Sequence, residues 1–109
     1  MKKFTFTLEE NIYNMLEAYA KANNLKIKDA VNGIILFMIP VLNEMIGKEN
    51  GNLFKYQKLS NPKKVRVEIN EKLKRELDLF HLKLDSYSIA TILRKMVELY
   101  FLFYFIEIL

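Results

Sequence analysis

Two short stretches, "KKFTFTLEE" at residues 2–10 and "KKVRVEINE" at residues 63–71, carry polar side chains at every second position. Successive side chains of a strand point to opposite faces, so the polar residues of each stretch share one face. Ammonium, guanidinium, hydroxyl and carboxylate groups on such a face can exchange hydrogen bonds with the edges of DNA bases. The residues of this polar set are Lys3, Thr5, Thr7, Lys64, Arg66 and Glu68.

The other half of each stretch is apolar, which predicts two half-buried strands. Their inward residues are Phe4, Phe6 and Leu8 in the first stretch and Val65, Val67 and Ile69 in the second. A two-stranded ribbon is marginal unless it packs on helices. We therefore expect the two strands to pair antiparallel, with helices over the apolar face and the polar sets together on the outer face.

A first helix is predicted after each strand, from apolar residues at helical spacing. In the first unit the stripe is Ile12, Leu16, Tyr19 and Asn23, widened by Met15, Ala18 and Ala22. In the second unit Asn70 is the expected N-cap, and the stripe is Leu73, Leu77, Phe80 and Leu84. Asparagine in "ANNLKIK" is expected to end the first of these helices, because it tolerates the left-handed conformation.

A second helix is predicted in each unit. The first begins near Ile27 and is apolar on nearly all sides, so it must be buried. Pro40 is expected to kink it or end it at Ile39, and the following residues to finish at Gly47. In the second unit Ser86 or Ser88 is the expected N-cap of a final helix, "IATILRKMVELYFLFYFIEIL".

The order strand, helix, helix therefore occurs twice. Placing Lys3 on Lys64 gives an offset of 64 − 3 = 61, which also places Leu16 on Leu77. We predict a mainly α protein with a two-stranded antiparallel ribbon and a pseudo-twofold axis, divided into residues 1–46, a linker at 47–62, and residues 63–109, together one compact domain. The sequence leaves open whether the two units pair within one chain or between chains.

Composition fits a small folded protein with a modest preference for polyanions. The chain has 109 residues, of which 51% are hydrophobic, and a net charge of +4. The absence of cysteine excludes disulfides and thiolate metal sites. "MKK" leads straight into the alternating stretch without a sustained apolar run, so no secretory signal is readable and we expect a cytoplasmic protein.

The stretches "FTFTLEENIYNMLEAYAKANNLKIKDAV" and "VRVEINEKLKRELDLFHLKLDSYSIATIL" resemble the ribbon-helix-helix family of DNA-binding proteins, here with two units in tandem. Asn24 stands where the turn glycine often lies, and Lys26 where a serine often caps the second helix. The second turn is less regular, since no Gly or Asn precedes Asp85. In composition and layout the chain is similar to small tandem regulators carried by viruses of hyperthermophilic archaea, and for a viral protein the expected location is the host cytoplasm.

The resemblance implies sequence-specific binding of double-stranded DNA, usually by a transcriptional activator or repressor. It assigns base contacts to the six polar ribbon residues: Lys64 and Arg66 would donate to guanine, Thr5 and Thr7 would meet thymine, and Glu68 would accept from cytosine, with Lys3 as a further reading position. It assigns phosphate contacts to the start of each second helix and the ribbon ends. These phosphate residues are Lys2, Lys26, Lys28, Lys63, Ser86 and Ser88.

The C-terminal run "LYFLFYFIEIL" favours a further surface. Its apolar stretch is too short to span a bilayer without Arg94, Lys95 and Glu98. The excess apolar area predicts a surface for another copy or another protein, and we expect self-association along DNA. The expected interface residues are Leu99, Phe101, Leu102, Phe103 and Phe105. A protein-interaction module of antitoxin type with secondary DNA binding is the alternative function, and a peripheral membrane protein a more remote one.

Catalysis has no support in the sequence. The chain contains no G-x-x-x-x-G-K-[ST], no H-E-x-x-H and no nucleophile beside an identifiable base. His81, the single histidine, is expected to be structural. No enzyme activity, cofactor, metal, small-molecule substrate or membrane partner is therefore predicted.

Overall fold

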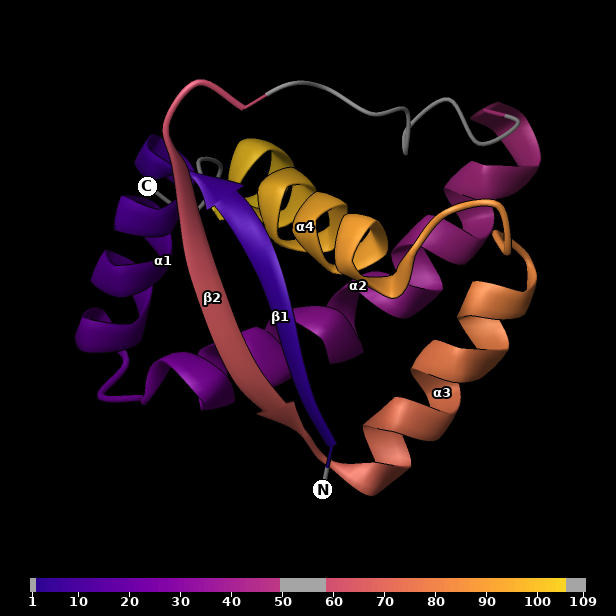
Figure 1. Cartoon of the computed structure of the whole chain (residues 1–109), viewed down its shortest axis with the longest axis horizontal. Helices are drawn as coiled ribbons and strands as arrows, with labels where there is room; N and C mark the ends of the chain where they lie inside the picture. The colour runs from indigo at the N-terminus through magenta and orange to yellow at the C-terminus, as the bar shows by residue number, and fades with distance from the viewer. Residues whose placement is uncertain (1, 50–58, 106–109) are drawn as a thin grey trace.

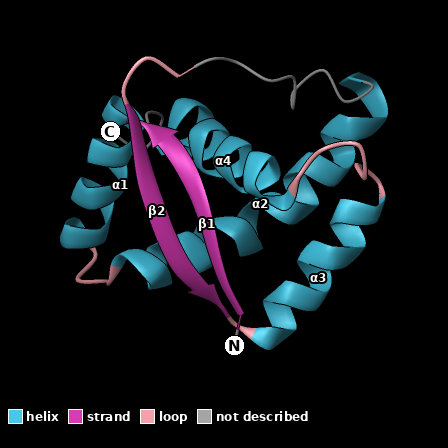
Figure 2. Ribbon diagram, viewed as in Figure 1, coloured by secondary structure: helices cyan, strands magenta, loops and turns pink. Residues whose placement is uncertain are grey.

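The computed structural model describes residues 2–49 and 59–105, and the side chains of residues 3–45 and 59–103. The protein is mainly helical with one two-stranded antiparallel sheet (Figures 1 and 2). The elements in chain order are β1 (Lys2–Glu9), α1 (Glu10–Ala22), α2 (Ile27–Glu49), β2 (Pro62–Ile69), α3 (Glu71–Leu82), α4 (Ile89–Tyr100) and a π-helix, η2 (Phe101–Phe105). The predicted element order is confirmed.

The two strands pair over their full length within the chain. Lys3 lies opposite Glu68, Thr5 opposite Arg66, and Thr7 opposite Lys64. The residue numbers of every pair sum to 71, for example 3 + 68 and 7 + 64. Adding the repeat offset of 61 to Lys3 and Thr7 gives positions 64 and 68, so the pair 3–68 maps onto the pair 64–7. The register is therefore symmetric about Thr5 and Arg66, at the centre of the ribbon.

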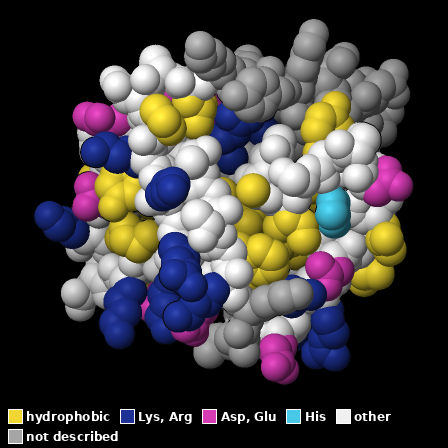
Figure 3. Space-filling view, in the orientation of Figure 1, with side chains coloured by type: hydrophobic (Ala, Val, Ile, Leu, Met, Phe, Trp, Pro, Cys, Tyr) yellow, Lys and Arg dark blue, Asp and Glu magenta, His cyan; other side chains and the backbone are white. Residues whose placement is uncertain are grey.

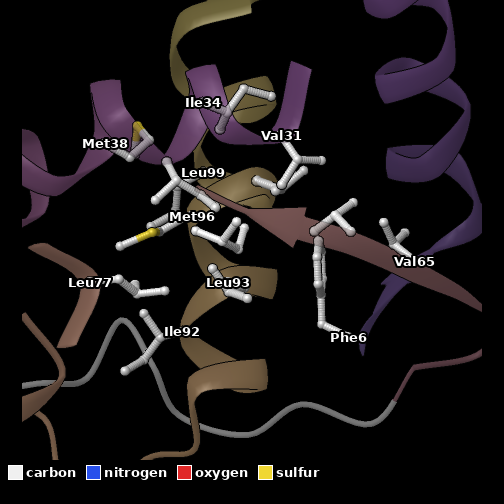
Figure 4. Packing of buried hydrophobic residues seen from close by; sticks show 14 of the residues in the cluster. Phe6, Val31, Ile34, Met38, Val65, Leu77, Ile92, Leu93, Met96 and Leu99 are labelled. Atoms are coloured by element: carbon white, nitrogen blue, oxygen red, sulfur yellow. The ribbon is translucent and has the colours of Figure 1, made fainter. Parts of the chain in front are cut away.

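The helices cover the inner face of the ribbon, and they cross between the two halves of the sequence. Helix α2 packs against β2 and α3, and α4 packs against β1, while α2 and α4 contact each other. Figure 4 shows core side chains from all these layers, including Phe6, Val65, Ile34 and Leu93. Each half thus completes the core of the other, which supports a single domain.

Helix α1 buries a narrower stripe than predicted. Ile12, Leu16 and Ala20 are buried, whereas Ala18 and Ala22 are exposed, so their assignment to the apolar face was wrong. The predicted end is confirmed: Asn24 has φ of 56°, and the Leu25 backbone N–H donates to the Ala20 carbonyl at 2.8 Å. Asparagine reaches this left-handed conformation more readily than most residues.

Helix α2 continues past Ile39, where Pro40 was expected to end the helix if it did not kink it, and past Gly47, the other predicted end. Pro40 is exposed and lies inside the helix, and Gly47 precedes its last residue, Glu49. The carbonyl that Pro40 leaves without its usual helical partner belongs to Leu36, a residue that is itself exposed. The ends of the predicted linker at 47–62 are corrected as well, because residues 47–49 are helical and Pro62 begins β2.

Helix α4 begins one residue later than the repeat offset of 61 predicts from the start of α2. Helices α2 and α4 begin at Ile27 and Ile89, an offset of 89 − 27 = 62 rather than 61. Ser88, not Ser86, is the N-cap, accepting the Thr91 backbone N–H at 3.1 Å. The Tyr87 carbonyl accepts a 2.7 Å hydrogen bond from His81 Nε2, which agrees with the structural role predicted for this histidine.

The C-terminal run divides into core and surface. Leu99 and Phe101 are buried, so their prediction as interface residues is wrong. The ring of Phe101 lies 5.8 Å from that of Tyr19 and 5.3 Å from that of Tyr100, both edge to face. Burial, followed by a hydrogen bond with Tyr19, raises the pKa of Tyr100 to about 12.

After Tyr100 the α-helix α4 is followed directly by the π-helix η2. Leu102 and Phe103 are 46% and 53% exposed, so both are available at the surface for association. The side chain of Phe105 lies outside the described side chains.

A carboxylate fixes the end of β1 to the start of β2. Glu9 accepts hydrogen bonds from the Ser60 hydroxyl at 2.6 Å, the Asn61 backbone N–H at 2.8 Å and the Ser60 backbone N–H at 3.1 Å. The Ser60 hydroxyl, followed by these backbone groups, lowers the pKa of the Glu9 carboxyl below its usual 4.5. The sequence offered no spacing rule that joins residues so far apart in the chain.

We expect Glu9→Gln to lower the thermal unfolding midpoint at neutral pH and to weaken its acid dependence. Because the folded-state pKa is depressed, the ionised carboxylate stabilises the protein above the ordinary value of 4.5, and this stabilisation is lost as the pH falls through the lowered pKa. Thermal denaturation of both proteins across this range measures the effect. Glu10→Gln, which removes the same charge from the adjacent exposed residue, is the control. Parallel pH profiles for wild type and Glu9→Gln would refute the role of Glu9.

Candidate nucleic-acid interface

The outer face of the ribbon presents the six predicted side chains in three opposed pairs. Lys3, Thr5, Lys64 and Arg66 are exposed, and Thr7 and Glu68 are partly exposed. Alternation along both strands keeps this row separate from the core residues beneath it. The formal charge of the row is +3 − 1 = +2, from three cations and one carboxylate. The structure therefore brings together all six residues that the sequence assigned to base contacts.

The two ends of this row differ chemically. Lys3 Nζ lies 3.9 Å from Glu68 Oε1, an ion pair across the strands. At the symmetry-related end Lys64 lies opposite Thr7, whose hydroxyl carries no charge. One end thus presents a cation and an anion that partly compensate each other, and the other presents a cation beside a neutral hydroxyl.

Helix α2 begins beside β2 (Figure 1). A shallow depression here is lined by Lys28, Lys3, Arg66, Val67 and Glu68. Lys28 therefore lies beside the ribbon row, as the phosphate prediction requires, and the preceding Lys26 is exposed. The first N–H groups of a helix have no partner within it and attract anions, although Asp29 in the same turn opposes this.

Helix α4 begins beside β1, on the opposite flank of the ribbon (Figure 1). Ser88 caps it, and its first turn contains no acidic residue. Ser86 is exposed in the preceding turn. The groups predicted to contact phosphate therefore differ between the flanks: lysines with one carboxylate at α2, and a serine-capped helix end at α4.

The remaining predicted phosphate residues are less favourably placed or undescribed. Strand alternation sets Lys63 on the same side as Val65, so its exposed side chain leaves the ribbon toward the helices rather than beside Lys64. This direction argues against contact with DNA in the groove. The side chain of Lys2 lies outside the described side chains.

Sequence reasoning missed Asn32, which positions one end of the ribbon. Its Nδ2 donates to the Glu68 carbonyl at 2.8 Å, and its Oδ1 accepts the Asn70 backbone N–H at 3.2 Å. These bonds connect α2 to the end of β2, at the strand residue that forms the Lys3–Glu68 pair. A polar residue in the otherwise apolar run "AVNGIILF" was the available signal.

The face that carries the ribbon is not uniformly charged. Figure 3, in the orientation of Figure 1, shows Lys and Arg side chains gathered over and beside β2, whereas apolar and uncharged atoms cover much of the surface between β1 and α3. A polyanion on this face would therefore meet most of its positive charge on the β2 side.

The chain matches no known family model, no curated protein and no solved structure. The resemblance to ribbon-helix-helix proteins therefore stays a prediction from the sequence. Within residues 2–49 and 59–105, no helix is long and apolar enough to cross a membrane. The same residues contain no group of three or more His, Asp or Glu side chains placed to hold a metal ion.

Replacing Lys28 tests the flanking contact. Lys28→Ala is expected to weaken binding to specific and random duplexes alike and to lower the slope of log K against log salt by about one, because one phosphate contact is lost. Titrations at several salt concentrations measure this slope. Lys74→Ala is the matched control, since Lys74 lies on α3 in an ion pair with Asp78. An unchanged slope in Lys28→Ala would exclude Lys28 from the interface.

Proposed function

We propose that this protein is a sequence-specific double-stranded-DNA-binding transcriptional regulator built from two ribbon-helix-helix units in tandem. The two-stranded ribbon would enter the major groove, which has the width to admit it. Helices α2 and α4 would hold the phosphates on either side. No chemical step on the DNA is part of this proposal.

The observation that carries the proposal is the composition and placement of the outer ribbon row. Three cations, two hydroxyls and one carboxylate form one row of exposed or partly exposed side chains above a packed core. A strip that served only as a solvated surface would not need a helix N-terminus on each flank. Here α2 packs against β2 and α4 against β1, and Lys28 in the first turn of α2 lines a depression with Arg66 and Glu68, where a phosphate beside the ribbon could bind.

The symmetric register of the ribbon supports the tandem, pseudo-twofold arrangement. The side chains are not symmetric, since Lys-Thr-Thr on β1 corresponds to Lys-Arg-Glu on β2. Two half-sites read by these sets would differ in base sequence. We therefore expect a short operator with only imperfect dyad symmetry.

Binding selection from a random duplex library tests the proposal. The expected result is one enriched motif that includes guanine near the centre, the position Arg66 would read. Enrichment of no motif would reject sequence-specific recognition. Retention of a partner protein without binding to duplex would favour the alternative, an interaction module of antitoxin type.

A further inference from the structure

We infer that the groove between α2 and α3 receives the Leu102–Phe103 pair of a second copy of this chain, so that copies associate head to tail. This inference deepens the self-association on DNA expected within the proposed function. The groove is defined by two adjoining depressions that share Leu36 and Glu76. Its remaining apolar lining is Gly33, Ile39, Pro40, Leu73, Leu79 and Phe80.

Polar contacts hold the two helices together at both ends of this groove. At one end Asn32 accepts the Asn70 backbone N–H, and at the other Lys83 Nζ donates to Asn43 Oδ1 at 2.9 Å. Between these ends the groove is open: a Cβ added at Gly33 would meet no atom within 4 Å. Leu36 and Leu79 are 59% and 65% exposed. The groove is therefore a bounded apolar site with room for side chains.

The second half of the repeat does not reproduce the groove. With the offset of 62 for second helices, Gly33 corresponds to Lys95 and Leu36 to Glu98. Lys95 is buried, and its Nζ lies 3.1 Å from Glu98 Oε1. An ion pair thus stands where α2 leaves open apolar space, so the described part of the second unit does not repeat the groove at these positions.

The same chain carries a complementary group at a different place. Leu102 and Phe103 are about half exposed on η2, which contacts α1, and the run from Leu99 to Phe105 contains no charged residue. This pair would itself bring no charge into the mainly apolar groove, which Glu76, Lys72 and Lys83 also line. Helices α1 and α3 lie on opposite sides of the ribbon (Figure 1). A single contact between unlike surfaces of identical copies is heterologous, and it forms an open row wherever its rotation does not close a ring.

Groove-to-groove pairing is disfavoured by charge. Glu76 lines both depressions at the middle of the groove, so a twofold contact centred there would bring two carboxylates together. The uncharged Leu102–Phe103 pair avoids this repulsion. A second copy presenting that pair is therefore the occupant that the groove fits.

The contact is too small to form a stable dimer by itself. Two half-exposed side chains bury roughly 200 Å² on their own side, or about 400 Å² in total, against about 1,200 Å² for a small specific interface. Neighbouring copies on one duplex have a high effective concentration, which allows a weak contact to act. The chain should thus associate on DNA and remain monomeric in free solution.

Two variants and their mixture test this inference on duplexes that carry one or two copies of the selected site. Leu36→Glu places a charge in the groove, and Phe103→Asp places a charge in the Leu102–Phe103 pair. Each variant alone should bind the single site with an affinity within about twofold of wild type. On the two-site duplex wild type should bind the second site about tenfold more tightly than the first, and each variant should lose this cooperativity. An equimolar mixture of the two variants should regain part of the cooperativity. Two variants can occupy two sites in four ways, and one of these joins an intact Leu102–Phe103 pair to an intact groove. Leu25→Gln, an exposed apolar residue outside both surfaces, should behave as wild type.

The outcomes separate this inference from the proposed function. Loss of single-site binding by wild type would refute DNA recognition itself. Independent binding of wild type to two sites, full cooperativity in Leu36→Glu, or failure of the mixture to regain pairing would each overturn the head-to-tail contact and leave ribbon recognition intact. Loss of cooperativity in Leu25→Gln would show that the contact lies elsewhere.

Discussion

Phe101→Ala is expected to destabilise the protein by about 3–5 kcal/mol, the usual cost of truncating a buried phenylalanine to alanine. The Phe101 side chain is fully buried and contacts the rings of Tyr19 and Tyr100, so its loss leaves a cavity where α1 meets the end of α4. Denaturant unfolding monitored by circular dichroism measures the change. A loss of this size would remove much of the stability of a small domain.

Phe103→Ala provides the matched control two residues away. Phe103 is 53% exposed, so its truncation should change the free energy of unfolding by less than about 1 kcal/mol. Equal destabilisation by the two variants would contradict the division of the C-terminal run into core and surface. A stable Phe101→Ala protein that fails only in cooperative DNA binding would restore Phe101 to the association surface.

Arg66→Ala is expected to cost about 1–3 kcal/mol of binding free energy at one base position, which is the value of a bidentate contact with guanine. Arg66 is exposed at the centre of symmetry of the ribbon, opposite Thr5. The measurement is a set of dissociation constants for duplexes with each base at that position. Discrimination should vanish there and persist elsewhere.

Arg75→Ala, which removes an exposed arginine from α3, serves as the control for Arg66→Ala. It should leave the base preference unchanged at every position. If Arg66→Ala instead weakens binding equally on all duplexes, Arg66 contacts phosphate and does not read sequence.

The sequence predicted the ribbon well because strand alternation and burial follow the same period of two. Phe6, Leu8, Val65 and Val67 are all buried, and their polar neighbours face outward. The N-cap at Asn70 was predictable because the cap bond is local: its side chain accepts the Leu73 backbone N–H at 2.8 Å. Features that depend on residues close together in the chain can be predicted from a single sequence.

The errors arose where the outcome depended on which face of a helix met the core. Pro40 is tolerated because it lies on the exposed side of α2, a fact the residue type does not reveal. The apolar C-terminal run could not be divided by composition, since Phe101 and Phe103 are the same residue in different surroundings. The contacts of Glu9 with Ser60 and of Asn32 with the end of β2 join residues far apart in the chain, and no periodicity predicts them.

The most direct test of the central claim is methylation interference on the selected duplex with wild-type protein. Methylation of guanine N7 blocks the major groove, where a ribbon would donate from Arg66 and Lys64. We predict that methylation of guanines within a short central segment abolishes binding, whereas adenine N3 methylation in the minor groove of that segment has little effect. Binding that tolerates guanine N7 methylation but is blocked by adenine N3 methylation would contradict recognition through the ribbon.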